Sequence, residues 1–270
     1  MSLRDRLIDW IVSRPPGEGG RPFLLGLAGG QGIGKSYLSQ QIEERSAGRV
    51  AILSLDDYYL TKAQRAALAE EVHPLLATRG VPGTHDIQAL SVAIDTLSAA
   101  GEGAQTLLRR FDKITDDTLP PAQWGRFSGR PSVIVVEGWC MNARPVPDAG
   151  LSVPLNSLER EQDAGEVWRR YANARLAGDY RAFFDRFDSS VLLKPASFDM
   201  VIRWRIEQEV SNYRDKGLSP PEDLEDRIVA FVANYERITR RLIEDDAGFD
   251  IVIEVSGPAR DWRLVRPDTL

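Results

Sequence analysis

The sequence feature that most constrains this chain is a glycine-rich loop, Gly29-Gly30-Gln31-Gly32-Ile33-Gly34-Lys35-Ser36. Two of its glycines are separated by four residues and followed directly by Lys and Ser, which is the spacing of a phosphate-binding loop. A short apolar run, residues 22–27, precedes the loop, and an amphipathic pattern over residues 37–45 follows it. A strand, a glycine loop and a helix in this order predict an α/β fold with a polyphosphate site at its first turn.

Each residue type in this loop has a physical reason. Glycines adopt backbone conformations closed to other residues, and they let backbone N–H groups approach an anion closely. The N-terminus of the following helix adds about half a positive charge. Lys35 is placed to reach the β- and γ-phosphates of a nucleotide, and the Ser36 hydroxyl is placed to hold Mg²⁺. We therefore predict that residues 29–36, together with Tyr37, bind the nucleotide.

Composition argues against several classes of partner. The chain has 270 residues, a net charge of −6 and one cysteine, Cys140. An acidic balance disfavours nucleic acid, and a single cysteine permits no internal disulfide, which suits a reducing cytoplasm. Residues 1–14 contain Asp5 and Asp9 and no long apolar run, so we expect neither a signal peptide nor a membrane span. A helix packed on the domain is the plain interpretation, and a helix on a membrane surface is the alternative. No linker-like stretch divides the chain, so one domain over residues 1–270 is expected. The sequence does not indicate an oligomeric state.

Two predicted strands end in acidic residues. Residues 50–55 run into Asp56 and Asp57, and the most apolar stretch of the chain, residues 131–136, ends in Glu137. Ligands of parallel sheets collect at the carboxyl ends of the strands, so Asp56 is placed to accept a proton from a substrate hydroxyl or to hold Mg²⁺. Capping of the following helix is the alternative role for both aspartates. A buried Glu137 needs a nearby cation such as Mg²⁺ or Lys35.

The segment after the second strand contains candidate substrate contacts. Arg79 and His85 lie in a glycine-bracketed loop rich in turn-forming residues. This loop predicts a small polar pocket, although a lone histidine is as often structural. Asp86 has the alternative role of capping the helix predicted over residues 87–99. Farther along, Arg110 is predicted to anchor an acidic substrate, because its planar guanidinium matches a carboxylate.

Other cations have plainer explanations or limited reach. Arg109 and Lys113 are expected to be solvated surface charges. In the long helix predicted before the Pro-Pro pair, Arg203 and Arg214 share one face, whereas Arg205 lies nearly opposite, at about 100° of rotation per residue. The three arginines therefore cannot reach one phosphate together from an unbent helix.

Taken in order, these motifs resemble those of the P-loop small-molecule kinases related to uridine kinase, phosphoribulokinase and pantothenate kinase, and more narrowly those of the D-glycerate 3-kinase branch. The residues that carry the resemblance are 29–36, Ser54-Leu55-Asp56-Asp57-Tyr58-Tyr59, 79–86, Arg110-Phe111-Asp112-Lys113, Glu137-Gly138-Trp139 and 204–209. The resemblance implies a mainly parallel five-stranded sheet flanked by helices, with a helical lid at about residues 199–217. It also implies a substrate-loop insertion at about residues 60–130.

The same resemblance implies roles for individual residues. Lys35 and Ser36 would hold ATP and Mg²⁺, Asp56 would be the catalytic base, and Arg205 would contact the nucleotide from the lid. The implied metal ligands are Ser36, Asp56 and Glu137. The candidate substrate contacts are Asp57, Tyr59, Arg79, His85, Asp86 and Arg110.

The predicted reaction is transfer of the γ-phosphoryl group of ATP to a hydroxyl of a small carboxylic acid, with glycerate as the leading acceptor. Two alternatives stay open. One is a kinase of the same fold for a nucleoside or vitamin precursor, for which Tyr58 and Tyr59 would offer stacking surfaces. The other is a nucleotide-dependent switch without a small acceptor. Residues 61–64 lack the final Asp of a guanine-reading motif, which disfavours a GTPase.

Overall fold

Five parallel strands and one antiparallel edge strand form the central sheet of the computed structural model, which describes residues 1–266. The strands lie in the order β10-β9-β8-β1-β7-β2. Their bounds are β1 Phe23–Gly29, β2 Val50–Ser54, β7 Val133–Gly138, β8 Ser189–Pro195, β9 Ile251–Ser256 and β10 Asp261–Arg266. The five parallel strands confirm the predicted sheet. The sixth, β10, was not predicted because its residues alternate between exposed and half-buried and form no continuous apolar run.

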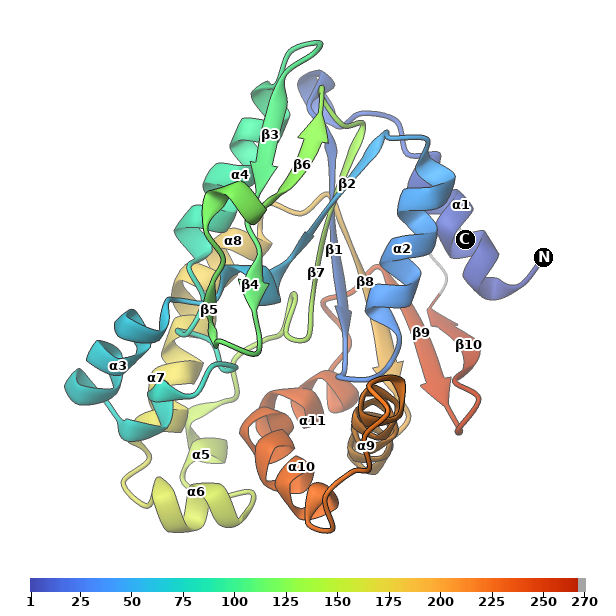
Figure 1. Ribbon diagram of the computed structural model, residues 1–270. Helices are drawn as coiled ribbons and strands as arrows, with labels where there is room; N and C mark the ends of the chain where they lie inside the picture. Colours follow the sequence, from blue (N-terminus) through green and yellow to red (C-terminus); the bar gives the residue numbers. More distant parts are fainter. Residues whose placement is uncertain (267–270) are drawn as a thin grey trace.

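Helices cover both faces of this sheet (Figure 1). On one face lie α1, Leu3–Val12, and α2, Lys35–Ser46, which pack against Val133 and Val135 of β7. On the other face lie α4, Ile87–Ala99, and α8, Arg181–Phe184, which join the core formed by Ile134 and Val136. The alternation along β7 explains why a strand buried on both faces has an unbroken apolar sequence. No helix within residues 1–266 is both long enough and apolar enough to pass through a bilayer.

A third group of helices lies beyond the carboxyl ends of the strands, at the lower edge of the sheet in Figure 1. It consists of α9, Phe198–Asp215, α10, Leu224–Val232, and α11, Glu236–Glu244. The sequence after Pro220-Pro221 predicts one continuous helix to about Ile243, which is wrong: a 3₁₀ turn, Ala233–Tyr235, separates α10 from α11. The break lets α10 pack on α9 while Tyr235 turns into the core beside Trp139, with ring centroids 4.9 Å apart.

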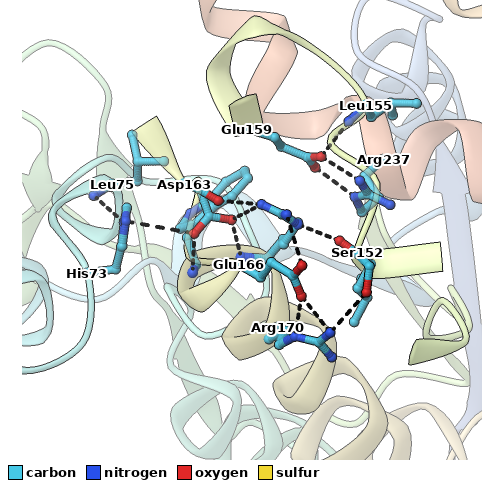
Figure 2. Close-up of polar contacts among 12 residues, drawn as sticks. His73, Leu75, Ser152, Leu155, Glu159, Asp163, Glu166, Arg170 and Arg237 are labelled. Atoms are coloured by element: carbon cyan, nitrogen blue, oxygen red, sulfur yellow. Dashed lines mark hydrogen bonds and ion pairs between the residues drawn. The ribbon is translucent and has the colours of Figure 1, made fainter. Parts of the chain in front are cut away.

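Short helices cover the flank of the sheet next to α4. They are α3, Lys62–Glu71, α5, Asp148–Leu151, α6, Ser157–Gln162, and α7, Val167–Arg175, which continues through a π turn, Leu176–Tyr180, into α8. A network of polar contacts holds them together (Figure 2). Asp163 pairs with Arg169 at 2.8 Å, and Glu159 pairs with Arg237 of α11. Because the side chains of Asp163 and Glu159 are almost completely buried, their paired cations are needed to keep the carboxylates inside.

Two hairpins extend from the segment between α4 and β7. The first pairs β3, Gln105–Leu108, with β6, Gly125–Ser128, and the second pairs β4, Phe111–Asp112, with β5, Asp117–Thr118. Both are antiparallel and separate from the central sheet. The turn between β4 and β5 contains Lys113 and Ile114, whose side chains line the pocket described below.

Candidate active site

The site is a cavity of about 460 Å³ at the carboxyl ends of the central strands. Its walls come from the glycine loop, the ends of β2 and β7, the β4–β5 turn and one face of α9. Among the side chains that line it are Lys35, Ser36, Asp56, Tyr59, Arg79, Lys113, Glu137, Trp139, Arg205 and Tyr235. The tertiary fold therefore brings the predicted phosphate loop and both predicted strand-end acids, Asp56 and Glu137, into one pocket.

The glycine loop has the backbone conformation that its composition predicts. Gly32 and Gly34 have φ values of 71° and 106°, in the left-handed region that favours glycine. At Gly32 space is limiting as well, because an added Cβ would lie 2.8 Å from the backbone carbonyl carbon of Trp204 in α9. The loop and α9 are thus packed directly against each other.

Lys35 begins α2 and turns back over the loop. Its ammonium group donates hydrogen bonds to the carbonyl oxygens of Gly29, at 2.8 Å, and Gly30, at 3.3 Å. Burial lowers the pKa of Lys35, and the carboxylates of Glu137 and Asp56 only partly offset that effect. The positive charge of Lys35 therefore lies inside the pocket, close to both acids.

Glu137 lies at the end of β7, the strand between β1 and β2. It is in register with Leu27 on β1 and with Ser54 on β2. Burial raises the pKa of Glu137, while the ammonium group of Lys35 opposes this shift. Because only 8% of Glu137 is exposed, a cation within the pocket is the partner that its carboxylate needs.

Asp56 follows β2 in a short 3₁₀ turn, Leu55–Tyr58, and accepts two hydrogen bonds within the pocket. The Tyr59 hydroxyl donates to one carboxylate oxygen at 3.2 Å, and the Lys113 ammonium donates to the other at 2.8 Å. Burial raises the pKa of Asp56, but the charges of Lys113 and Lys35 outweigh burial and lower it to about 2. Asp56 is therefore ionised at neutral pH.

Sequence reasoning missed Lys113. It was expected to be a solvated surface charge, but its ammonium group forms an ion pair with Asp56 and lines the pocket. The β4–β5 hairpin causes the difference, since it folds the segment back across the end of β2. Three cations around Phe111 were visible in the sequence, yet nothing there indicated which of them faces the pocket.

Two of the predicted substrate contacts, Tyr59 and Arg79, line the pocket. The guanidinium group of Arg79 bonds with the carboxylate of Asp116 and lies over the Phe111 ring, 5.6 Å from the centroid. The loop that follows Arg79 is anchored by Trp139, whose indole N–H donates to the carbonyl of Gly80 at 3.1 Å. Arg79 is therefore held from two sides before any substrate binds.

His85 does not line this pocket. Only 3% of it is exposed, and its Nδ1 lies 2.6 Å from the hydroxyl of Tyr180 in the π turn. It stacks on Tyr59 with ring centroids 4.4 Å apart and lines a different cavity of about 570 Å³. Burial lowers the pKa of His85 to about 3, so the ring is neutral at neutral pH.

Three more predicted substrate contacts have structural partners and lie outside the pocket. Asp86 caps α4 by accepting from the Ala89 N–H at 2.9 Å, which is the alternative that the sequence offered. Asp57 accepts from Arg110 at 2.8 Å and so joins the 3₁₀ turn to β4. Arg109 was not a predicted substrate contact but was expected on the surface; it is buried and pairs with Asp86 at 3.2 Å. The three predicted contacts, Asp57, Asp86 and Arg110, therefore support the pocket wall and do not line it.

Among the arginines of α9, Arg205 lines the pocket, whereas Arg203 and Arg214 are exposed and do not. This agrees with the angular separation derived from helical geometry, since α9 is an unbroken helix. Arg205 pairs with Glu209 one turn along and donates to Gln208 at 2.8 Å. Tyr37, predicted to contact the nucleotide, is 54% exposed and lines a neighbouring cavity of about 590 Å³ on the outer side of the glycine loop.

Known proteins with related sequences are kinases. No protein-family model matches the chain. It is 31% identical over 243 residues to the uncharacterized kinase mug58 of Schizosaccharomyces pombe, a match covering 86% of this chain and 84% of that protein. The chain belongs to the P-loop kinases related to D-glycerate 3-kinase.

A second relative and a solved structure are also similar to this chain. The P-loop kinase described here is 27% identical over 237 residues to the chloroplastic D-glycerate 3-kinase of Arabidopsis thaliana, covering 80% of this chain and 47% of that longer protein. Its fold matches the structure of D-glycerate 3-kinase from Cryptococcus neoformans with a TM-score of 0.74 and 19% identity, covering 98% of this chain and all of that one. The predicted α/β P-loop fold is confirmed.

The side chains of this P-loop kinase fit a Mg²⁺–nucleotide. Within residues 1–266 no group of three or more His, Cys, Asp or Glu forms a ready metal cage. Mg²⁺ in kinases does not require one, because it keeps several waters and is held by one or two protein oxygens and by phosphates. Ser36, Asp56 and Glu137 line one pocket and all present oxygen atoms, so their donor chemistry suits this ion.

Proposed function

We propose that this kinase transfers the γ-phosphoryl group of ATP to a hydroxyl of a small carboxylic acid, with glycerate as the leading acceptor. One observation supports this most: the ionised carboxylate of Asp56 lies in the same pocket as the phosphate loop and two further cations, Arg79 and Lys113. A hydroxyl next to Asp56 would face the phosphate loop, while an acidic group of the same molecule would face the cations.

The proposed reaction needs positioning and charge neutralisation more than covalent chemistry. The acceptor hydroxyl donates its hydrogen bond to Asp56, which takes the proton as the oxygen forms its bond to the γ-phosphorus. The bond from that phosphorus to the bridging oxygen breaks, and its electron pair leaves with ADP. Lys35 neutralises charge on the phosphate oxygens, and Arg205 adds a second cation from α9. When bound through Ser36, Asp56 and Glu137, Mg²⁺ would supply further charge neutralisation.

We extend the proposal to the organisation of the chain. Residues 1–270 would act as one kinase domain, with residues 60–130 forming the acceptor side and α9 covering the phosphates as a lid. The last four residues lie outside the described part of the chain. A reducing cytoplasm suits the single cysteine, Cys140, which is buried.

The burial of Tyr58 and Tyr59 weakens the argument for a nucleoside acceptor. Tyr58 and Tyr59 are each 2% exposed. Tyr59 already stacks on His85, and Tyr58 belongs to the core under α4. Neither ring offers a free face for a base, so a small acidic acceptor suits this pocket better.

The test is ADP release from purified protein with ATP and Mg²⁺ in the presence of single candidate acceptors. The panel holds hydroxy acids, including glycerate, and nucleosides and pantothenate. We expect acceptor-dependent ADP release with a hydroxy acid and a phosphorylated product of equal amount, detected by phosphorus NMR. The Asp56→Asn variant controls for contaminating kinases. Release that depends on a nucleoside or pantothenate alone would replace the proposed acceptor, and release independent of any acceptor would favour the switch.

A further inference from the structure

The turn between β4 and β5 places one flexible cation directly against the proposed catalytic base. The β4–β5 hairpin lies beside the carboxyl end of β2 in Figure 1. Lys113 lies at its turn, and its ammonium group is 2.8 Å from a carboxylate oxygen of Asp56. Its side chain remains 59% exposed and borders the cavity. Lys113 is therefore accessible to a ligand while it is bound to Asp56.

An ammonium group has three hydrogen-bond donors, and one of those on Lys113 is directed at Asp56. Two other cations of the pocket each have two partners: Lys35 donates to two loop carbonyls, and Arg205 is bound to both Gln208 and Glu209. Arg79, like Lys113, has one hydrogen-bonded partner, the carboxylate of Asp116. Lys113 is the one of these two that also touches the proposed base, and it keeps two donors for a further anion.

The hairpin also sets the second cation beside Lys113. Asp116, in the same turn, has a φ of 59° and accepts hydrogen bonds from Arg79 and from the fully buried Arg65. Arg65 and Arg79 both lie over the Phe111 ring, at 5.7 and 5.6 Å from its centroid. One short hairpin therefore fixes the guanidinium of Arg79 and delivers Lys113 to the same pocket wall.

We infer that Lys113 is the residue that selects an acidic acceptor: it binds the acceptor's carboxylate while keeping its contact with Asp56. This inference rests on the proposed function and names the part of the site that determines its substrate class. A lysine shared by the base and the acceptor's carboxylate places the reacting hydroxyl within a few bonds of that carboxylate. Short hydroxy acids fit this spacing, and acceptors with a distant or missing carboxylate do not.

The test compares wild-type protein with Lys113→Met, Lys113→Arg and a matched control, Lys62→Met. Lys62 is an exposed lysine in α3 that does not line the pocket. Each protein is assayed with ATP and either glycerate or its neutral amide, which has the same hydroxyls. For Lys113→Met we expect kcat/KM for glycerate to fall on the order of 100-fold through a higher KM, with the KM for ATP unchanged. Activity on the amide should fall much less than activity on glycerate, Lys113→Arg should recover part of the loss, and Lys62→Met should match wild type.

Other outcomes separate this inference from the proposed function. If Lys113→Met lowers kcat equally for both acceptors without changing KM, Lys113 serves the base or the transferred phosphoryl group, and the inference is wrong. If the variant behaves like wild type, the inference is also wrong while the proposed function stands. If wild-type protein shows no turnover of the amide, the kinetics on glycerate alone decide: a higher KM in Lys113→Met supports the inference, and a lower kcat at unchanged KM contradicts it. If wild-type protein phosphorylates no hydroxy acid, the proposed function itself fails.

Discussion

Tyr59 and His85 stack on each other with their ring centroids 4.4 Å apart, and they line different cavities. Tyr59 faces the proposed active site and bonds to Asp56, whereas His85 lies behind it and bonds to Tyr180. A histidine predicted to bind substrate is therefore a support for the tyrosine that contacts the base. Substitution of His85 should therefore change the stability of the protein more than its catalytic rate.

The buried neutral state of His85 predicts a pH-dependent stability. Its folded-state pKa of about 3 lies below the unfolded value of about 6.5. Between these values the unfolded chain binds a proton that the folded chain does not, so the free energy of unfolding falls as pH falls through this window. The slope from this group approaches about 1.4 kcal/mol per pH unit. In denaturant titrations from pH 7 to 4, His85→Asn should have a shallower slope than wild type. Equal slopes would contradict the burial argument.

Two adjacent arginines should differ sharply in their effect on stability. The Arg109 side chain is 10% exposed and pairs with Asp86, whereas that of Arg110 is 44% exposed and pairs with Asp57. Removing a buried partner costs about 3 kcal/mol or more, and an exposed pair contributes about 1 kcal/mol or less. Chemical denaturation of Arg109→Ala and Arg110→Ala measures both. A large loss for Arg110→Ala alone would show that the burial of the two has been misassigned.

The contact between the glycine loop and α9 predicts a difference between two glycine substitutions. Gly32 and Gly48 have φ values of 71° and 77°, but an atom added at Gly48 would meet nothing within 4 Å. Gly48→Ala should cost about 1 kcal/mol for the left-handed conformation alone. Gly32→Ala should cost more, because α9 must shift away from the loop, and it should also weaken ATP binding. Calorimetric unfolding and nucleotide titration test the pair, and equal costs would argue against the contact.

Asp56→Asn should separate catalysis from nucleotide binding. The amide keeps the size of the side chain but accepts a proton poorly, so kcat should fall by about 100-fold or more. The Kd for ATP, measured by calorimetry, should change little. A fully active Asp56→Asn enzyme would remove the assignment of Asp56 as base.

Lys35→Ala should abolish turnover while leaving the fold intact. Its ammonium group donates hydrogen bonds to the carbonyls of Gly29 and Gly30 in the loop proposed to hold the phosphates. Loss of one preorganised charge of this kind lowers kcat by at least about 100-fold. The circular dichroism spectrum and thermal unfolding should match wild type. Retained activity would show that the loop does not hold the reacting phosphates.

The sequence predicted the parts of this protein whose physics is local. Four apolar runs and a glycine loop with a following helix correspond to β1, β2, β7, β8 and α2, because burial on both faces of a sheet imposes an unbroken apolar pattern. The pattern of residues 249–253 predicts a fifth strand two residues too early, since β9 begins at Ile251. The edge strand β10 and both small hairpins were missed, as their half-exposed, charged residues resemble loops.

The sequence by itself determined that a nucleotide site exists and that Asp56 and Glu137 end strands beside it, since spacing and strand direction suffice for that. Only the tertiary structure decided which of the neighbouring cations face the cavity. Arg109 and Arg110 support its wall, and Lys113 reaches the base, because a hairpin folds back across the end of β2. Which side of a short irregular segment meets the pocket depends on distant packing partners, and no local pattern encodes that.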